Sequence, residues 1–595
     1  MLQSKLAAAN PHPPRPHPPR PRLTLNVGIT GHRAAILPDG VLDALKPVVD
    51  EVFSRLRAAM LELHSAEQAI FDSEPPQLRL HTPLATGADQ LAADSARASG
   101  YHVRALLPFA PDEYRVDFAA GEELVEFEAQ LAAADEICAL PCERSDGEGA
   151  YVAVGKAVVA AADILVAIWD GREGNGPGGT AHVVDHALVT SVPVIHVAID
   201  RASAKVEAVR LLSGGDTVEP SAELLGREGD YAELLRDTLL PHTATEREQI
   251  AAYLLERETL TNWRIEYPLM LALLGVKRLS SAPWRQSPVM HELGSSERLD
   301  HAYAWANFLA IRYAQRFRSG HVMNYALSAL AVVLALMGLI VPQAKVFLVI
   351  AELGTIALLF RNTRAGTEGD WHRRWLQYRH LAESLRPLGY LKRTGMISTP
   401  FRSDFIHGPL HREAGADWTR WYAAAIWREM ASPRGIITAA DIRDLADEVL
   451  NDQVVPQAAY HRANAERMHK LDHRLHEVGN LLIGAVIASC VLFLIAYLPF
   501  PDLIKAVTTP FIFLTAGLPA VGAAVFGLRG HGEHLLAASR SANTVVALEA
   551  NAARLKQATR LEGLAVELEK TAAIMLADLN EWSVSYRERS LEVPA

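Results

Sequence analysis

The chain has 595 residues, enough for roughly two to four domains. Its formal net charge of -11 argues against a protein that binds nucleic acid, because such proteins carry a basic surface. Hydrophobic residues make up 50% of the chain and are concentrated in two regions, which indicates a membrane protein. The three cysteines, Cys138, Cys142 and Cys490, form no CxxC pair and exclude a disulfide framework.

The first 22 residues contain the proline-rich repeat PHPPRPHPPRPR. This composition is typical of an extended segment without a packed core, so we predict that residues 1–22 form a disordered tail. No long apolar run opens the chain, and we therefore expect the domain that follows to remain in the cytoplasm.

Residues 23–200 alternate short apolar runs with amphipathic stretches. The apolar runs are LTLNVGIT, LRLHTPLAT, YHVRALLPF, ADILVAIWD and VPVIHVAID, and helical stretches such as VLDALKPVVDEVFSRLRAAM separate them. Apolar strands that alternate with helices indicate a parallel sheet covered on both faces. The fold class that we predict for this part is therefore α/β, a Rossmann-like domain with a doubly wound parallel sheet of about five units.

The rest of the chain is predicted to be α-helical, with four transmembrane helices in two hairpins. A helical linker region, 201–320, precedes the first hairpin, 321–361. A cytoplasmic helical region, 362–477, separates it from the second hairpin, 478–529. The spans are long enough to cross a hydrocarbon core of roughly 30 Å. Residues 530–595 predict a C-terminal amphipathic helix, and the similar plan of the two halves suggests duplication of a two-helix unit.

The distribution of positive charge predicts the orientation in the membrane. Basic residues flank the spans on one side, namely Arg312, Arg316, Arg318, Arg361, Arg364, Arg373, Arg374, Lys470, Arg474 and Arg529. The opposite side carries only Lys345 and Lys505. Because positive residues stay on the cytoplasmic side, we expect a multi-pass protein whose soluble domains and both termini are cytoplasmic.

Glu352 is the pore candidate, because it is a carboxylate inside a predicted span. One alternative is that Glu352 side chains line a cation path in an oligomer. The other is that Glu352 is protonated, or bonded to a polar neighbour such as Thr355 or to another helix. Pro510 and Pro519 interrupt the fourth span, where they serve either as a gating hinge or only in packing.

His469, His473 and His476 have helical spacing, but no cluster of Asp, Glu or Cys completes a ligand set, so we predict no metal site. The chain has neither a Walker lysine loop nor a GxSxG elbow, and we assign no catalytic residue.

Three glycine-bearing loops follow predicted strands. They are VGITGHR, ATGADQLAADSARASG and WDGREGNGPGGTAHVVDHAL. Because the carboxyl ends of parallel strands meet at one edge of a sheet, we expect these loops to form one ligand site that binds phosphate through backbone N–H groups. The candidate ligand-binding residues are Gly28, Thr30, Gly31, His32, Arg33, Thr86, Gly87, Ala88, Asp89, Trp169, Asp170, Gly178, Gly179 and Thr180. For Asp89, capping of its own helix is the alternative.

The order GITGHR, TGADQLA and WDG…PGGT resembles the SLOG superfamily, the Rossmann-like group related to the LOG and DprA proteins, over residues 23–200. The resemblance implies binding of a nucleotide or a nucleotide-derived ligand and no further cofactor. LOG enzymes carry a PGGxGTxxE motif, whereas this chain has Val183 at the position of the glutamate and Asp185 as the nearest acid. This departure favours a binding domain without turnover.

The membrane part is similar in layout to the SLATT-type two-helix effector domain. The residues that carry this likeness are the pair of spans at 322–360 and the following WHRRWLQYRHLAESLR. The resemblance implies a homo-oligomeric, pore-forming or membrane-disrupting effector of the bacterial inner membrane, switched on by a nucleotide second messenger in antiphage defence. SLOG-like domains also occur in TRPM cation channels, which makes a nucleotide-gated channel in ion homeostasis an alternative.

Two further hypotheses stay open. One is a membrane-tethered nucleotide hydrolase, a LOG-like N-glycosidase with Asp185 or Asp170 as the acid. The other is a scaffold whose α/β domain binds only a protein. The partners expected from the leading interpretation are a nucleotide-derived small molecule, the lipid bilayer and further copies of the chain, with no nucleic acid.

Overall fold

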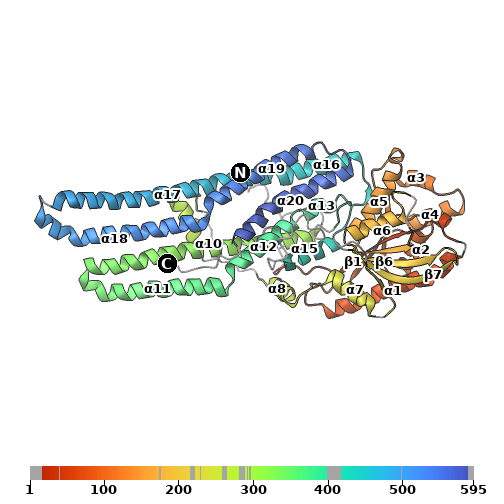
Figure 1. The fold of residues 1–595 in the computed structure, drawn as a ribbon, viewed down its shortest axis with the longest axis horizontal. Coiled ribbons are helices and arrows are strands. Elements are labelled where there is room, and N and C mark those ends of the chain that lie inside the picture. The colour runs from red at the N-terminus through yellow and green to blue at the C-terminus, as the bar shows by residue number, and fades with distance from the viewer. Residues whose placement is uncertain are drawn as a thin grey trace.

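The molecule is elongated, with the α/β domain at one end and four long helices at the other (Figure 1). This computed structural model describes residues 16–38, 40–172, 176–214, 221–227, 229–257, 264–279, 288–290, 293, 296–398, 417–497 and 499–586. The turns of both long hairpins lie at the same end, far from the sheet.

A mixed, mostly parallel sheet forms the core of the α/β domain. Within the described residues it has nine strands in the order β8-β7-β6-β5-β1-β2-β3-β4-β9. The neighbouring strands β6, β5, β1, β2, β3, β4 and β9 pair in parallel. Strand β7 pairs antiparallel with β6, and β8 pairs antiparallel with β7. The bounds are β1 Thr24–Gly31, β2 Gln77–Thr82, β3 His102–Leu107, β4 Glu136–Ala139, β5 Ile164–Trp169, β6 Val194–Asp200, β7 Lys205–Ser213, β8 Ser221–Leu224 and β9 Gly435–Ile436.

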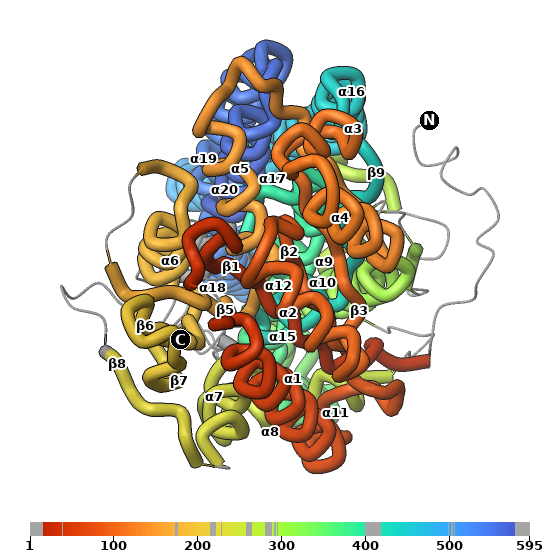
Figure 2. The backbone as a smooth tube through the Cα atoms, turned by 90° about the vertical axis from the view of Figure 1, so that its right-hand side faces the viewer, coloured from red at the N-terminus to blue at the C-terminus, as the bar shows by residue number. Residues whose placement is uncertain are grey.

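Helices cover both faces of this sheet. Figures 1 and 2 show α5 (Glu148–Ala161) and α6 (Thr180–Val189) on one side, with α1 (Val41–Ala66) and α7 (Asp230–Leu239) on the other. The remaining helices of the domain are α2 Ala88–Ala98, α3 Pro111–Tyr114 and α4 Glu122–Ala132. Strands β2 to β4 lie on one side of β1, and β5 and β6 lie on the other, so the crossovers change direction between β1 and β5. Such a switch point is typical of a doubly wound fold.

The sheet extends beyond residues 23–200. Strands β7 and β8 come from the region 201–320, which was predicted to be helical, and β9 comes from the region 362–477. Both assignments were wrong at these positions. β7 is half-exposed and gains its stability from pairing with β6, whereas β9 has only two residues and shows no periodicity.

Residues 16–22 pack against the protein, so the prediction of a disordered tail fails for them. The Tyr422 hydroxyl donates to the Pro19 carbonyl at 2.5 Å, and the Arg22 N–H donates to the Glu429 carboxylate at 2.7 Å. Prolines 18, 19 and 21 are buried. The segment lacks hydrophobic periodicity, but its backbone finds partners on helix α15 (Asp417–Glu429). Residues 1–15 lie outside the described residues.

The helical region between sheet and hairpins is built from segments far apart in sequence. Its helices are α8 Ala244–Leu254, α9 Glu266–Leu273, α12 Trp371–Leu385, α13 Leu388–Lys392, α15, α16 Ala439–Val449, α19 His534–Leu555 and α20 Leu561–Tyr586. The predicted single C-terminal helix is two helices, because the chain reverses at 556–560 and Thr571 donates to Asn551 Oδ1 at 2.5 Å across the turn. Residues 587–595 of that prediction lie outside the described residues.

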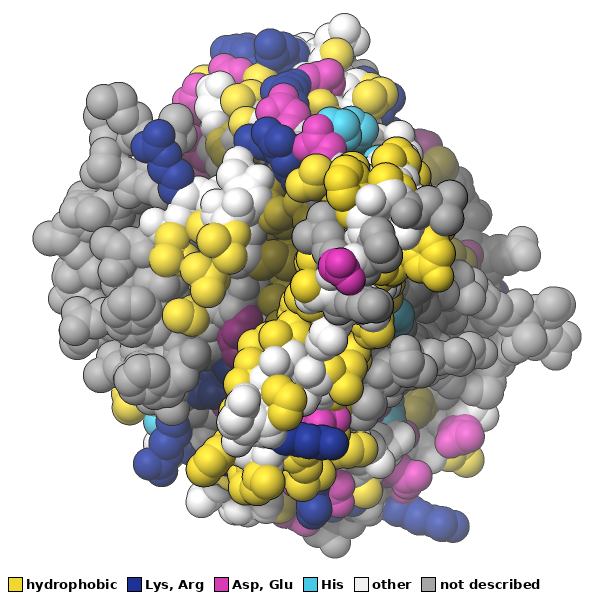
Figure 3. Space-filling view, turned by 90° about the vertical axis from the view of Figure 1, so that its left-hand side faces the viewer, with side chains coloured by type: hydrophobic (Ala, Val, Ile, Leu, Met, Phe, Trp, Pro, Cys, Tyr) yellow, Lys and Arg dark blue, Asp and Glu magenta, His cyan; other side chains and the backbone are white. Residues whose placement is uncertain are grey.

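Four helices of the described chain are long and apolar enough to cross a membrane, as predicted. They are α10 Glu297–Ile340, α11 Lys345–Glu368, α17 Val455–Tyr497 and α18 Pro501–Gly532. Between 6% and 17% of each apolar stretch is buried, so most of its surface is left for lipid or for other copies. Seen from the end with the turns, hydrophobic side chains dominate these helices (Figure 3).

Buried polar contacts fasten the two hairpins. In the first, Asn362 donates to Asn324 Oδ1 at 2.6 Å and to the Gly320 carbonyl at 3.0 Å, which ties α11 to α10. In the second, Arg529 of α18 donates to both carboxylate oxygens of Asp472 on α17, at 2.9 and 3.0 Å. These contacts fix the register of each pair of helices.

The two hairpins touch through α10 and α18. Tyr325 Oη lies 2.6 Å from His531 Nδ1, and Gly527 leaves room for the Tyr325 ring, because a Cβ there would stand 2.3 Å from it. Helix α18 continues through Pro510 and Pro519 without interruption. The helices therefore lie in the order α11, α10, α18, α17 (Figure 1).

Glu352 is half-buried on α11, and its carboxyl group makes no hydrogen bond or ion pair with the described residues. The Thr355 hydroxyl donates to the Ala351 carbonyl at 2.8 Å, so Thr355 is not its partner.

Arg298, in the first turn of α10, joins this helix to the α/β domain. Its guanidinium contacts Asp72 at 2.6 Å, Glu74 at 3.1 Å and Glu429 at 3.1 Å. It also donates to the Arg20 carbonyl at 2.6 Å, and its side chain is only 12% exposed. The first membrane helix thus starts inside a charged cluster of the soluble part.

We expect Arg298→Gln to destabilise the protein by on the order of 3 kcal/mol, because it leaves the carboxylates of Asp72 and Glu429 without their cation. The measurement is thermal unfolding of the detergent-solubilised full chain. Lys46→Gln is the control: it breaks an exposed ion pair with Asp50 and should leave the midpoint unchanged. Equal midpoints for Arg298→Gln and the control would refute the anchoring role.

Candidate functional site

A cavity of about 400 Å³ opens at the carboxyl ends of β1 and β5, where the crossovers change direction. We call it the sheet-edge cavity. Its lining is Ile29, Thr30, Gly31, His32, Arg33, Ile36, Pro83, Ala85, Asp89, Tyr114, Tyr151, Val154, Gly155, Val158, Trp169, Asp170, Arg172, Gly178, Gly179, Thr180, Ala181, Val183 and Arg201. Ligands of open α/β sheets bind at this switch point, so the position alone makes the cavity a candidate binding site.

The end of β1 forms the floor. Gly31 pairs with Ile168 of β5, and the His32 N–H donates to the Ile168 carbonyl at 3.2 Å. A Cβ on Gly31 would stand 2.3 Å from the Ala88 side chain, so only glycine lets α2 approach the strand this closely. The backbone of 32–34 lies directly against the loop that begins α2.

Asp170, just past the end of β5, organises one wall. Its Oδ1 lies 3.0 Å from His32 Nε2, and its Oδ2 accepts from Arg201 Nε at 2.7 Å. The Arg172 N–H donates to Oδ1 at 3.3 Å. Burial disfavours the charged carboxylate, but the hydrogen bonds from His32, Arg201 and Arg172 outweigh it and lower the pKa of Asp170. Asp170 is therefore ionised and already partnered.

Asp89, in the first turn of α2, has one carboxyl oxygen without a hydrogen-bond partner. Its Oδ2 accepts from the Ala85 N–H at 3.3 Å, whereas its Oδ1 is buried with no hydrogen-bond partner. Burial raises the pKa of Asp89 to about 7, against the opposing effects of the Ala85 N–H and the Arg33 charge. One oxygen thus serves the local turn, and the other is available to a ligand of the cavity that Asp89 lines.

Helix α6 directs its N-terminus at the cavity. Gly178, at φ +82°, and Gly179 precede it, and no side chain caps it. A Cβ on Gly178 would lie 3.0 Å from Tyr151 and 3.1 Å from the backbone of Val152, so glycine permits the close approach of this loop to α5. An uncapped helix N-terminus of this kind attracts anions.

Ten of the fourteen predicted ligand-binding residues line the cavity: Thr30, Gly31, His32, Arg33, Asp89, Trp169, Asp170, Gly178, Gly179 and Thr180. The other four support it. Gly28 packs against Val158 and Ala162, and Thr86, Gly87 and Ala88 hold the first loop. The Thr86 carbonyl accepts from the Ala34 N–H at 3.1 Å, and the Ala88 N–H donates to the His32 carbonyl at 3.2 Å. The N-terminus of α2 is therefore occupied by protein.

Sequence reasoning missed Tyr114, Tyr151, Arg172 and Arg201. The signal for Arg201 was present, because it directly follows the apolar run VPVIHVAID and hence the carboxyl end of β6. Tyr151 lies on α5, which does not directly follow a strand, and the fold brings it to the cavity.

The charges of the cavity favour an anion. Arg33, Arg172 and Arg201 line it, and Asp170 is the acid that offsets them when Asp89 is protonated. Arg33 makes no ion pair with any described residue, and its guanidinium lies 5.5 Å from the Tyr151 ring centroid. Arginines and a helix N-terminus are the groups that bind phosphate. Among the described residues, no group of three His, Cys, Asp or Glu side chains could hold a metal ion.

No known protein family, curated protein or solved structure matches this chain.

We expect the pH dependence of stability to reveal Asp89. Its pKa in the folded protein, about 7, exceeds the ordinary 3.8, so its stabilising contribution is complete below pH 3.8 and is lost as the pH rises towards 7. Asp89→Asn keeps a neutral group and should gain on the order of 2 kcal/mol relative to the parent protein between pH 5 and pH 8. Unfolding of both proteins at the two pH values measures this, and a pH-independent difference would show that Asp89 does not titrate in this range.

Proposed function

We propose that the chain is a ligand-controlled membrane effector whose sheet-edge cavity binds a nucleotide-derived signal. The observation that carries this proposal is the cavity itself, which lies at the switch point of the sheet and combines three arginines, the N-terminus of α6 and the unpartnered Oδ1 of Asp89. Arginine and helix N–H groups suit phosphate, and a carboxyl oxygen suits a ribose hydroxyl.

A path for the signal runs along β5. The strand ends at the cavity, with Trp169 and Asp170, and begins beside Asp163. Asp163 accepts from Arg428 Nε of α15 at 2.9 Å and from the Asn26 N–H of β1 at 3.0 Å. Glu429, the next residue after Arg428, contacts Arg298 of α10. A strand of six residues, about 20 Å long, thus separates the cavity from the anchor of the first membrane helix.

The membrane part acts, in this proposal, as an oligomer in the bacterial inner membrane with the soluble part in the cytoplasm. Helix α11 packs on α10, and its remaining faces are exposed. Because a carboxylate such as Glu352 is costly in lipid, we infer that α11 faces another copy and that Glu352 lines the resulting conduit. Gating then requires that the ligand bind the open state more tightly than the closed state.

The hydrolase alternative is weaker. Asp185 is exposed on α6 and does not line the cavity, and Asp170 is already engaged by His32 and Arg201. Asp185 is thus outside the cavity, and Asp170 is held by two neighbours, so neither carboxylate suits the acid of an N-glycosidase. The role in antiphage defence rests on the resemblance to SLOG and SLATT domains, as does the alternative of a TRPM-like channel.

A ligand should stabilise the full chain. We would record thermal unfolding in detergent with linear and cyclic nucleotides and ADP-ribose derivatives, and assay the same samples for turnover. We expect stabilisation without turnover. The double variant Arg33→Gln/Arg201→Gln should bind at least about tenfold more weakly, through loss of charge-assisted contacts. Lys46→Gln/Arg443→Gln, two exposed charges outside the cavity, is the matched control. Turnover would favour the hydrolase, and no response to any compound would favour the scaffold.

Glu352 should control permeation. In liposomes, we expect the stabilising nucleotide to release a trapped cation, and Glu352→Gln to reduce cation over anion selectivity several-fold, because the charge that favours cations is gone. Glu368→Gln, at the end of α11, is the control. Unchanged selectivity in Glu352→Gln would place the conduit elsewhere, and steady ion-selective current without loss of membrane integrity would favour the channel alternative.

A further inference from the structure

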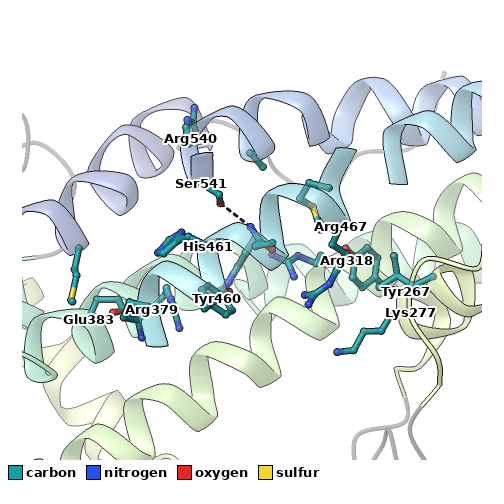
Figure 4. A pocket seen from close by; sticks show the side chains of 17 residues that line it. Tyr267, Lys277, Arg318, Arg379, Glu383, Tyr460, His461, Arg467, Arg540 and Ser541 are labelled. Carbon is teal, nitrogen blue, oxygen red and sulfur yellow. Dashed lines mark hydrogen bonds and ion pairs between the residues drawn. The ribbon is translucent and has the colours of Figure 1, made fainter. Parts of the chain in front are cut away.

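A second cavity, of about 270 Å³, lies among helices α9, α10, α12, α17, α19 and α20. We call it the junction cavity. Figure 4 shows that its side chains come from helices of both halves of the membrane part. Its lining is Tyr267, Leu271, Lys277, Arg318, Trp375, Arg379, Glu383, Gln457, Tyr460, His461, Asn464, Arg467, Met468, Ala537, Arg540, Ser541 and Met575. It is distinct from the sheet-edge cavity and shares no residue with it.

The junction cavity is strongly cationic. Five basic side chains from five segments line it: Lys277 after α9, Arg318 of α10, Arg379 of α12, Arg467 of α17 and Arg540 of α19. The acid among the lining residues is Glu383. Glu383 is already bound by Arg379 and by Arg386, the latter at 3.2 Å, and its pKa is lowered because these charges outweigh its burial. It therefore does not neutralise the other four cations.

Two of these cations have no partner among the described residues. The side chains of Arg467 and Lys277 make no hydrogen bond or ion pair with the described residues. Lys277 is exposed and Arg467 is half-buried, and partial burial together with the charge of Arg467 lowers the pKa of Lys277. Gathering like charges in one cavity costs free energy, and a bound anion would relieve that cost.

The neighbouring groups suit phosphate. Arg318 is held over two rings, 4.8 Å from the Trp375 centroid and 5.5 Å from that of Tyr267. The Ser541 hydroxyl, which accepts from Asn464 Nδ2 at 3.0 Å, adds a donor to the lining. A guanidinium fixed in this way presents its N–H fork to a phosphate, and hydroxyl groups complete the shell.

We propose that the junction cavity binds a phosphate-bearing anion, supplied by a lipid headgroup or by a soluble phosphate compound, which clamps the two hairpins together. Arg318 lies only four residues, about 6 Å, before the apolar stretch of α10, so a headgroup is within reach. The anion would touch α10 and α12 on one side and α17 and α19 on the other. Its binding would set how the hairpins sit relative to each other.

The test uses the delipidated full chain in a neutral detergent. Thermal unfolding is followed with inorganic pyrophosphate in one arm, with cardiolipin in a second and with phosphatidylcholine in a third. We expect stabilisation by pyrophosphate, by cardiolipin or by both, and little by phosphatidylcholine, whose headgroup has no net charge. Stabilisation by pyrophosphate alone identifies a soluble compound as the source, and stabilisation by cardiolipin alone identifies a lipid headgroup.

The decisive variant is Lys277→Gln/Arg467→Gln, because neither side chain supports another protein group. We expect it to unfold at or above the parent temperature without anion, since repulsion is relieved, and to require about tenfold more anion for half-maximal stabilisation. Arg443→Gln/Lys556→Gln removes two exposed charges elsewhere and should respond as the parent does. No stabilisation in either anionic arm, or an unchanged response in the decisive variant, would overturn the proposal. Every arm is repeated in the Arg33→Gln/Arg201→Gln background, which removes two arginines of the sheet-edge cavity; the response that remains should still be weakened by Lys277→Gln/Arg467→Gln, and this separates the two sites.

Discussion

The continuity of helix α10 is the constraint on which the rest of the structure depends. It has 44 residues and is about 66 Å long. At one end Arg298 is held by carboxylates of the α/β domain and of α15, and at the other the helix reaches the turn of the first hairpin. Helices α11, α12 and α18 all pack on it. Because α10 is continuous, a rotation of the α/β domain would also move the apolar stretch of α10. The helices packed on α10 would then move with it or shift relative to it.

The contacts within each hairpin differ from the contacts between the two hairpins. Each hairpin is closed by buried polar groups, Asn324 with Asn362 in the first and Asp472 with Arg529 in the second. The hairpins meet along α10 and α18, where Tyr325 packs against the surface of Gly527. The Tyr325 hydroxyl also lies 2.6 Å from His531 Nδ1 of α18, so this boundary combines close packing with a directional polar contact. The junction cavity lies beside this boundary, because α10, α12, α17 and α19 all contribute to its lining.

The sequence was informative where structure is local. Strands and spans follow from periodicity and length, and the parallel order of the strands brought the loops at Gly31 and Gly179 to one edge. It was uninformative where a residue is stabilised by a distant partner. Strand β9 is formed where Gly435 pairs with β4, and the Pro19 carbonyl accepts a hydrogen bond from Tyr422, 403 residues away in the chain. Tyr151 reaches the sheet-edge cavity through topology, which no short motif records.

Both cavities are connected to helix α10. The sheet-edge cavity is connected to α10 through β5, Asp163 and α15, and the junction cavity contacts α10 through Arg318. If each anion favours one arrangement of the hairpins, the two binding free energies are coupled, and the coupling must be reciprocal. An anion that clamps the resting arrangement would then weaken binding of the signal by the same factor by which the signal weakens the clamp. The strength of the clamp, rather than the affinity of the sensor alone, would set the signal concentration at which the membrane helices respond.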